Sequence, residues 1–131
     1  MFKRRKKINF RSGLESIIQD QLKSEQVNFS YESDKIKYTI PERPAKYTPD
    51  FTIVRNDGSI LYIEGKGRFV AADRKKHLLI REQHPELDIR FVFSDPNNRI
   101  SKNSKTTYAD WCNKYGFKYS KKEIPRDWLL N

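Results

Sequence analysis

Three residues of this chain could do chemistry together: Asp50, Glu64 and Lys66. Asp50 follows Pro49 at the start of one apolar run, and Glu64 and Lys66 lie at the end of the next apolar run. Glu64 and Lys66 would project from one face of a strand, because side chains alternate between the two faces along a strand. A hairpin joining the two runs would place Asp50 beside them. Two carboxylates and one amine would then share a small volume.

Such a group suits the hydrolysis of a phosphodiester. Carboxylate oxygens are hard ligands of the kind that bind Mg²⁺ or Mn²⁺. One metal ion can polarise a phosphoryl oxygen and activate water, and a second can stabilise the leaving oxygen. Lys66 could orient the attacking water or offset charge in the transition state. A plainer interpretation stays open, in which Asp50 is a turn residue and Glu64 and Lys66 form a solvated strand edge, because so short a pattern also arises by chance.

The net charge favours a nucleic-acid partner. The 131 residues include 27 Lys+Arg and 17 Asp+Glu, which gives a formal net charge of +10. A basic surface attracts polyanions, although it can also serve solubility alone. A membrane surface is not expected, because no long apolar or amphipathic segment accompanies the charge. The basic side chains form three groups, which are Lys3, Arg4, Arg5, Lys6 and Lys7 with Arg11; Arg68, Arg74, Lys75 and Lys76 beside Lys66; and Lys102 with Lys105.

The middle group flanks the proposed metal site, where phosphate would have to bind, so we interpret it as a DNA-binding surface. The first group makes residues 1–11 a basic arm, which we expect to be flexible until it meets phosphate. We expect no signal peptide, because no apolar stretch follows the arm. The single cysteine, Cys112, rules out an intramolecular disulfide and fits a reducing compartment.

The pattern of apolar residues predicts one α/β domain over residues 12–131, with a mixed sheet flanked by helices. The apolar face of the first helix would consist of Leu14, Ile17, Ile18 and Leu22, and Leu78 and Leu79 would face the core from the second. Pro41 and Pro44 favour a stiff, extended connector between strands. The expected elements are helices over 14–27, 71–84 and 106–115, strands at 29–31, 35–40 and 88–94, a hairpin of strands 50–55 and 59–64, and a polar loop at 95–105.

Glu15 has two possible roles. The sequence Ser12-Gly13-Leu14-Glu15 matches a capping box, in which the glutamate side chain bonds back to the start of the helix. The local sequence favours this role over a place in a metal site. The two histidines, His77 and His84, have no cysteine near them in the sequence, so a zinc site is not expected.

Four segments of the chain are distinctive, namely Phe10-Arg11-Ser12-Gly13-Leu14-Glu15, Tyr47-Thr48-Pro49-Asp50-Phe51, Glu64-Gly65-Lys66-Gly67 and the long run from Asp73 to Leu87. Through these segments nearly the whole chain, from about Phe10 to Trp128, resembles the phage endonuclease I family of Holliday-junction resolvases, which belongs to the PD-(D/E)xK nuclease superfamily. The resemblance implies a restriction-endonuclease-like fold and a catalytic set of Glu15, Asp50, Glu64 and Lys66. It therefore reverses the local preference for a cap at Glu15.

The resemblance also implies a metal site and a dimer. Asp50, Glu64 and the Gly65 carbonyl would hold one Mg²⁺ or Mn²⁺, and Glu15 would help to hold a second. The family forms an intertwined homodimer, so residues 12–40 would be exchanged between subunits and residues 41–46 would form the bridge. Glu15 of one subunit would then meet Asp50, Glu64 and Lys66 of the other, and two such sites would match the approximate two-fold symmetry of a four-way junction.

The residues predict a metal-dependent nuclease, and the resemblance implies that it is a Mg²⁺-dependent endonuclease that resolves branched DNA in the bacterial cytoplasm, with no small-molecule cofactor. It would recognise branch shape and phosphate rather than bases. Two alternatives are a general or sequence-specific duplex nuclease of the same fold and a DNA-binding module without catalytic activity.

Overall fold

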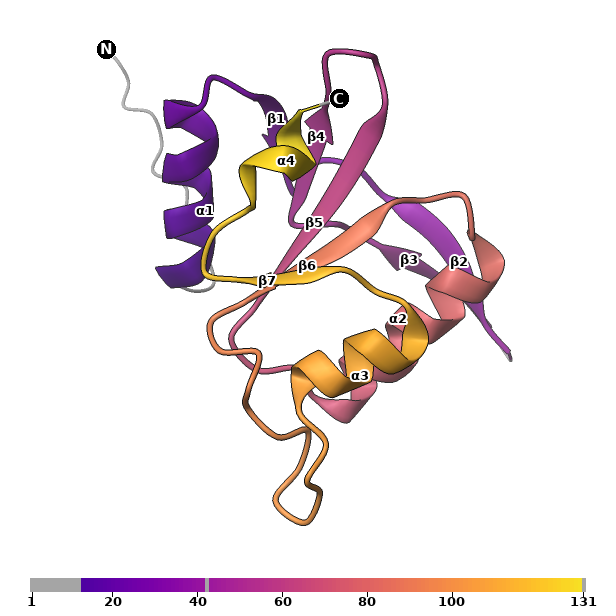
Figure 1. Ribbon diagram of the computed structural model, residues 1–131. Helices are drawn as coiled ribbons and strands as arrows, with labels where there is room; N and C mark the ends of the chain where they lie inside the picture. Colours follow the sequence, from indigo (N-terminus) through magenta and orange to yellow (C-terminus); the bar gives the residue numbers. More distant parts are fainter. Residues whose placement is uncertain (1–12, 42, 131) are drawn as a thin grey trace.

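The computed structural model describes residues 13–41 and 43–130 of the chain, so the predicted basic arm, with Lys3, Arg4, Arg5, Lys6, Lys7 and Arg11, lies outside the described residues. Its elements, shown in Figure 1, are α1 (Gly13–Ser24), β1 (Asn28–Tyr31), β2 (Ile36–Ile40), β3 (Arg43–Tyr47), β4 (Phe51–Val54), β5 (Ile60–Lys66), α2 (Ala71–Gln83), β6 (Ile89–Phe93), α3 (Tyr108–Tyr115), β7 (Tyr119–Lys121) and α4 (Arg126–Leu129).

A mixed five-stranded sheet forms the centre, in the order β1-β4-β5-β6-β7. The first three strands in that order pair antiparallel, and β5, β6 and β7 pair parallel. The predicted α/β fold with a mixed sheet is therefore confirmed. The predicted hairpin is also confirmed, since β4 and β5 pair from Phe51↔Ile63 to Val54↔Ile60. Gly58 lies in its turn at φ 88°, a conformation that glycine adopts without strain.

The two faces of the sheet carry different helices (Figure 1). On one face, α1 and the short α4 pack on alternate residues of the central strands, among them Ile63 and Val92. On the other face, aromatic residues including Phe91 and Phe93 pack with α3. The alternation follows from the two-residue period of a strand, and it leaves both faces of β5 and β6 covered. Among the described residues, no helix is long and apolar enough to span a membrane.

The first helix differs from expectation in two details. It ends at Ser24 rather than near Val27, because Gln26 takes a left-handed conformation (φ 56°) and the Val27 amide bonds back to the Leu22 carbonyl over 3.1 Å. This is a Schellman ending without glycine. Ile17 was predicted on the apolar face, but its side chain is 47% exposed. That prediction is wrong, because the buried face of α1 is rotated away from Ile17 and includes the polar residues Glu15 and Gln19 beside Leu14, Ile18 and Leu22.

The predicted second and third helices are confirmed, with shorter bounds. Leu78 and Leu79 pack against the core as predicted, but they are only half-buried, and the most deeply buried residues of α2 are His77 and Ile80, which were not predicted. The predicted end of α3 is right, because Gly116 closes it in a left-handed conformation (φ 79°). Its start has a capping box of Thr107 and Asp110, which was not predicted.

The segment from Pro41 to Pro44, predicted as a stiff, extended connector, includes the start of strand β3. The chain reverses after Ile40, and β3 pairs with β2 from Ile40↔Arg43 to Ile36↔Tyr47. Pro44 lies opposite Thr39 in this two-stranded ribbon. A two-stranded ribbon leaves one side of each strand unpaired, so a residue without an N–H can be accommodated there. The ribbon is fastened to α2, because the Gln83 side chain bonds to both the N–H and the carbonyl of Thr39.

Candidate active site

The hairpin of β4 and β5 brings Asp50 and Glu64 together, as the sequence predicted. Asp50 directly precedes β4, and the pairing of Phe51 with Ile63 sets it next to the end of β5. The Asp50 amide donates a hydrogen bond to Glu64 Oε2 over 3.2 Å. Asp50 Oδ2 in turn accepts a hydrogen bond from the Gly65 amide over 3.0 Å. The backbone of β5 therefore fixes the carboxylate of Asp50 in place.

Glu64 is almost completely buried, with 4% of its surface exposed. The hydroxyl of Tyr47 donates a hydrogen bond to Glu64 Oε2 over 2.7 Å, and the Lys66 ammonium lies 3.6 Å from Oε1. Burial raises the pKa of Glu64, and the nearby Lys66 charge and the Tyr47 hydrogen bond oppose that rise. Burial and the Glu64 charge hold the pKa of Tyr47 well above its usual value, so its hydroxyl stays a donor.

Lys66 projects from the same face of β5 as Glu64, as its spacing predicted. Its Nζ lies 3.6 Å from Glu64 Oε1 and 3.5 Å from Asp73 Oδ2, which comes from the first turn of α2. Burial alone would lower the pKa of Lys66, but the carboxylates of Glu64, Asp73 and Asp50 outweigh it and raise the pKa. Lys66 therefore carries a positive charge at neutral pH and is held between two elements.

Glu15 reaches the same place from α1. It is 4% exposed, and the hydroxyl of Tyr31, the last residue of β1, donates a hydrogen bond to its Oε1 over 2.6 Å. Gly65 allows this approach, because a Cβ at that position would lie 3.1 Å from Ile18 Cδ1 and 3.7 Å from Glu15 Cγ. Ser12, the other half of the predicted capping box, lies outside the described residues.

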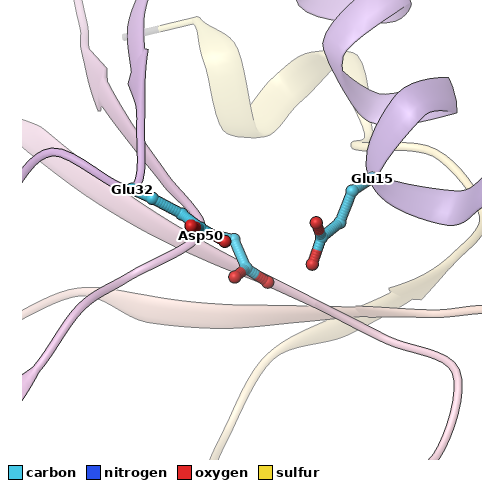
Figure 2. Close-up of side chains that lie close together, drawn as sticks. All are labelled: Glu15, Glu32 and Asp50. Carbon is cyan, nitrogen blue, oxygen red and sulfur yellow. The ribbon is translucent and has the colours of Figure 1, made fainter. Parts of the chain in front are cut away.

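A third carboxylate, Glu32, joins Glu15 and Asp50. Each of the three offers an oxygen within 4.8 Å of the other two, and Figure 2 shows Glu15 extending from α1 toward Asp50 and Glu32. Glu32 was not predicted as a site residue from the sequence. Its amide bonds to the Asp50 carbonyl over 2.9 Å, and its φ of 49° is uncommon for a residue other than glycine. The available signal was its place at a strand end, since Glu32 directly follows a strand as Asp50 directly precedes one.

This donor set fits a hard divalent cation. Burial, followed by the charges of Glu64 and Glu15, raises the pKa of Asp50 to about 8, while the Gly65 amide and Lys66 oppose the rise. Carboxylates crowded in this way are stabilised by a cation between them, and an all-oxygen set suits Mg²⁺ or Mn²⁺. Glu15, Glu32 and Asp50 make up the described acidic group, whereas Glu64 lies beside it with its oxygens facing Tyr47, Asp50 and Lys66.

The predicted DNA-binding residues that the structure describes differ in their contacts and in their distance from this site. Arg68 and Lys75 are exposed. Arg74 Nη1 donates to the Phe69 carbonyl over 2.6 Å, so its guanidinium braces the backbone. Lys76 lies over the Tyr47 ring, with 5.4 Å between Nζ and the ring centroid. A polar depression beside the acidic group is lined by Glu32, Lys35, Lys46, Thr48, Asp50 and Lys76.

Comparisons with known proteins bear on this geometry. A family model described as Phage endonuclease I matches residues 1–131. Endonuclease I of Escherichia phage T7 is 48% identical over 120 residues, which cover 92% of this chain and 78% of the relative. Endodeoxyribonuclease 1 of Enterobacteria phage T3 is 50% identical over 116 residues, which cover 88% of this chain and 74% of the relative.

Proposed function

Because this chain belongs to the phage endonuclease I family, we propose that it is a structure-selective DNA endonuclease that resolves four-way junctions by divalent-metal-dependent hydrolysis. One observation carries the chemical part of the proposal. Asp50, Glu64 and Lys66 are joined by direct contacts at adjoining strand ends, and Glu15 reaches Asp50 from another element. A basic chain with this acidic site is suited to cutting a phosphodiester.

The ligands follow from the donor set and the family resemblance. Asp50 and Glu64, with the Gly65 carbonyl, would hold one Mg²⁺ or Mn²⁺, and Glu15 would contribute to a second. Glu32 is a further candidate ligand, because its carboxylate lies within the same acidic group. When bound, the metal supplies the Lewis acidity that activates water and stabilises charge on the phosphate.

The remaining side chains position the reacting groups. Lys66, held between Glu64 and Asp73, places a fixed positive charge where the scissile phosphate would sit and offsets the charge that develops there. Tyr47 fixes Glu64 by donating to Oε2, and the Gly65 amide fixes Asp50. These contacts exist before any substrate arrives, so little reorganisation is needed at the moment of reaction.

DNA would approach over the basic groups around the site. Lys35, Lys46 and Lys76 surround the depression that opens beside Asp50, where phosphates next to the scissile bond would lie. Contacts of this kind position DNA without reading its sequence, which suits an enzyme that selects branch shape. Further contacts would come from Arg68, Arg74 and Lys75 and from the arm that carries Lys3, Arg4, Arg5, Lys6, Lys7 and Arg11.

The protein would act as an intertwined homodimer, in which residues 12–40 change places between subunits. The reversal between Ile40 and Arg43 is the natural hinge, because opening it would release β2 from β3. The exchanged elements α1, β1 and β2 would then make the same contacts with the partner subunit. The Glu15–Asp50 approach seen within this chain would then form between two chains. Two such sites would cut opposed strands of a junction. As a protein related to phage enzymes, it would work in the bacterial host cytoplasm.

An immobile four-way junction and a linear duplex of the same arm sequences test the substrate. Each is incubated with the protein in Mg²⁺, Mn²⁺ or Ca²⁺, and the products are mapped on a denaturing gel. We expect paired, symmetric cuts near the branch point in Mg²⁺, with little loss of duplex. Equal cutting of both substrates would favour a general duplex nuclease. Binding without cutting in any metal would favour a non-catalytic DNA-binding module.

A further inference from the structure

A second basic depression lies away from the acidic group, between the segment that leaves β5 and the loop that joins β6 to α3. Three cationic side chains line it, and no acidic residue does. Three more residues offer polar donors, namely Asn98, Ser101 and Tyr108. The full lining is Arg68, Phe69, Val70, Asn98, Arg99, Ile100, Ser101, Lys102 and Tyr108.

The walls of this depression are fixed by hydrogen bonds. Arg74 Nη1 donates to the Phe69 carbonyl over 2.6 Å and reaches the Ile100 carbonyl at 3.4 Å, so one guanidinium ties the two walls together. The loop is also closed on itself, since the Ile100 amide bonds to the Thr106 carbonyl over 2.8 Å. A site that is formed in advance loses little freedom when a ligand binds.

The cations of this depression are available to a ligand. Arg68, Arg99 and Lys102 are all exposed, and within residues 13–41 and 43–130 none of them forms an ion pair. One of them, Arg68, is also close to Lys66 along the chain. Arg68 follows Lys66 by two residues, so the two Cα atoms are separated by at most about 7 Å. Figure 1 shows the loop between β6 and α3 projecting from the body beside the start of α2.

We propose that this depression binds the phosphate backbone of the DNA arm whose scissile phosphate lies at Lys66. The proposal rests on the proposed nuclease function and adds a second site of contact to it. A duplex presents a phosphate about every 3.4 Å along each strand, so a strand with one phosphate at Lys66 has further phosphates within reach of Arg68, and Arg99 and Lys102 line the same depression as Arg68. Contacts at two places on one arm fix its direction as well as its position. An arm held in this way would meet the acidic site at one angle, which is a means of selecting branched DNA by shape.

The double variant Arg99→Ala/Lys102→Ala tests the site, and Arg68→Ala is a second, independent variant. The Arg99 and Lys102 side chains are exposed, and no described hydrogen bond depends on them, so the fold should survive; circular dichroism and a melting curve check this. Lys114→Ala/Lys118→Ala is the matched control. It removes the same charge from two exposed residues, one in the last turn of α3 and one just beyond that end of the helix.

The measurement is the affinity for a four-way junction in Ca²⁺ over a series of salt concentrations, by fluorescence anisotropy. We expect the slope of log affinity against log salt to fall by about 2 for the double variant and by about 1 for Arg68→Ala, because each lost phosphate contact removes about one released counterion. The decrease in slope for the control should be less than half of the decrease for the double variant. An unchanged slope, or an equal change in the control, would overturn the second site while wild-type cleavage leaves the nuclease function intact. Failure of the wild type to bind or cut branched DNA would overturn both.

Discussion

The hydroxyl of Tyr31 lies 2.6 Å from Glu15 Oε1 and donates a hydrogen bond to it. This contact joins the end of β1 to α1 at the place where the carboxylate of Glu15 turns toward Asp50. Tyr31 also packs on Phe51, with 5.2 Å between ring centroids. The ring therefore supports the core, and the hydroxyl orients a candidate metal ligand.

Tyr31→Phe should keep the packing of the ring on Phe51 and lose the hydrogen bond that orients the Glu15 carboxylate. Partners that orient metal ligands typically change metal affinity or activity by about 10- to 100-fold when removed. We expect junction cleavage to need more Mg²⁺ and to slow by roughly tenfold at fixed metal, with little change in melting temperature. Tyr119→Phe is the control, because that half-buried tyrosine lies away from the acidic group. If Tyr31→Phe cleaved at the wild-type rate at limiting Mg²⁺, Glu15 would not need the hydrogen bond from Tyr31.

Asp50→Asn should stabilise the metal-free protein at pH 8. The pKa of Asp50 is raised from its usual 3.8 to about 8 in the folded protein. Between these values the folded state binds a proton that the unfolded chain has released, so the contribution of Asp50 to the free energy of unfolding falls as pH rises. Asparagine removes the cost of ionising a carboxyl group at this buried position, and its side-chain oxygen can still accept the hydrogen bond from the Gly65 amide.

Melting curves in EDTA at pH 5 and pH 8 measure this effect. We expect Asp50→Asn to melt higher than the wild type at pH 8, by about 4 °C for each kcal/mol recovered, and the difference to shrink toward pH 5. Added Mn²⁺ should raise the melting temperature of the wild type and have little effect on the variant. A difference that is the same at both pH values would contradict the raised pKa as its cause.

Gly65→Ala should push α1 away from the sheet. The added Cβ would lie 3.1 Å from Ile18 Cδ1, which is closer than such atoms normally approach. We expect a loss of roughly 1–3 kcal/mol in the free energy of unfolding, the usual range for overpacking a core, and slower cleavage as Glu15 moves. Urea denaturation and single-turnover cleavage provide the two readouts.

Two further variants separate this clash from a general effect of alanine. Gly67→Ala is the control, because its Cβ would meet Ser94 Oγ only at 3.8 Å. Ile18→Val removes the clashing Cδ1, so the double variant Gly65→Ala/Ile18→Val should be more stable than the sum of the two single changes predicts. Strict additivity would show that contact with Ile18 is not the reason for glycine at position 65.

The proposed exchange between subunits can be tested by mixing two inactive variants. Glu15→Gln and Glu64→Gln are each expected to abolish cleavage. If residues 12–40 are exchanged, a heterodimer of the two has one site with both defects and one site with none, so it should nick one strand of a junction. Without exchange, every site carries one defect and the heterodimer stays inactive. Co-refolding with two affinity tags isolates the heterodimer for the assay.

Short-range patterns predicted the centre of this site well. One hairpin links Asp50, Glu64 and Lys66. Neighbouring residues in the sequence determine both its turn at Gly58 and the two-residue period of β5. The long helix α2 and the glycine that ends α3 were predictable for the same reason. The approach of Glu15 came from a family resemblance, because the local sequence favoured a cap.

The features that the sequence did not reveal depend on distant contacts. Glu32 joins Asp50 only because β1 pairs with β4, some twenty residues further along the chain. The second and third strands form a ribbon in spite of two prolines, since α2 supplies hydrogen bonds to one edge. Strand β7 is three residues long and forms beside β6, where its main chain completes the sheet. In each case tertiary packing outweighed local preference.

The most direct test of the central claim compares the wild type with Glu64→Gln on one labelled four-way junction. Single-turnover cleavage is measured in Mg²⁺, and junction affinity is measured in Ca²⁺. We predict that the variant loses at least about 100-fold in cleavage rate, as expected when a group central to catalysis is removed, and binds the junction within about threefold of the wild type. Cleavage by Glu64→Gln at the wild-type rate would contradict the assignment of this site as the catalytic centre.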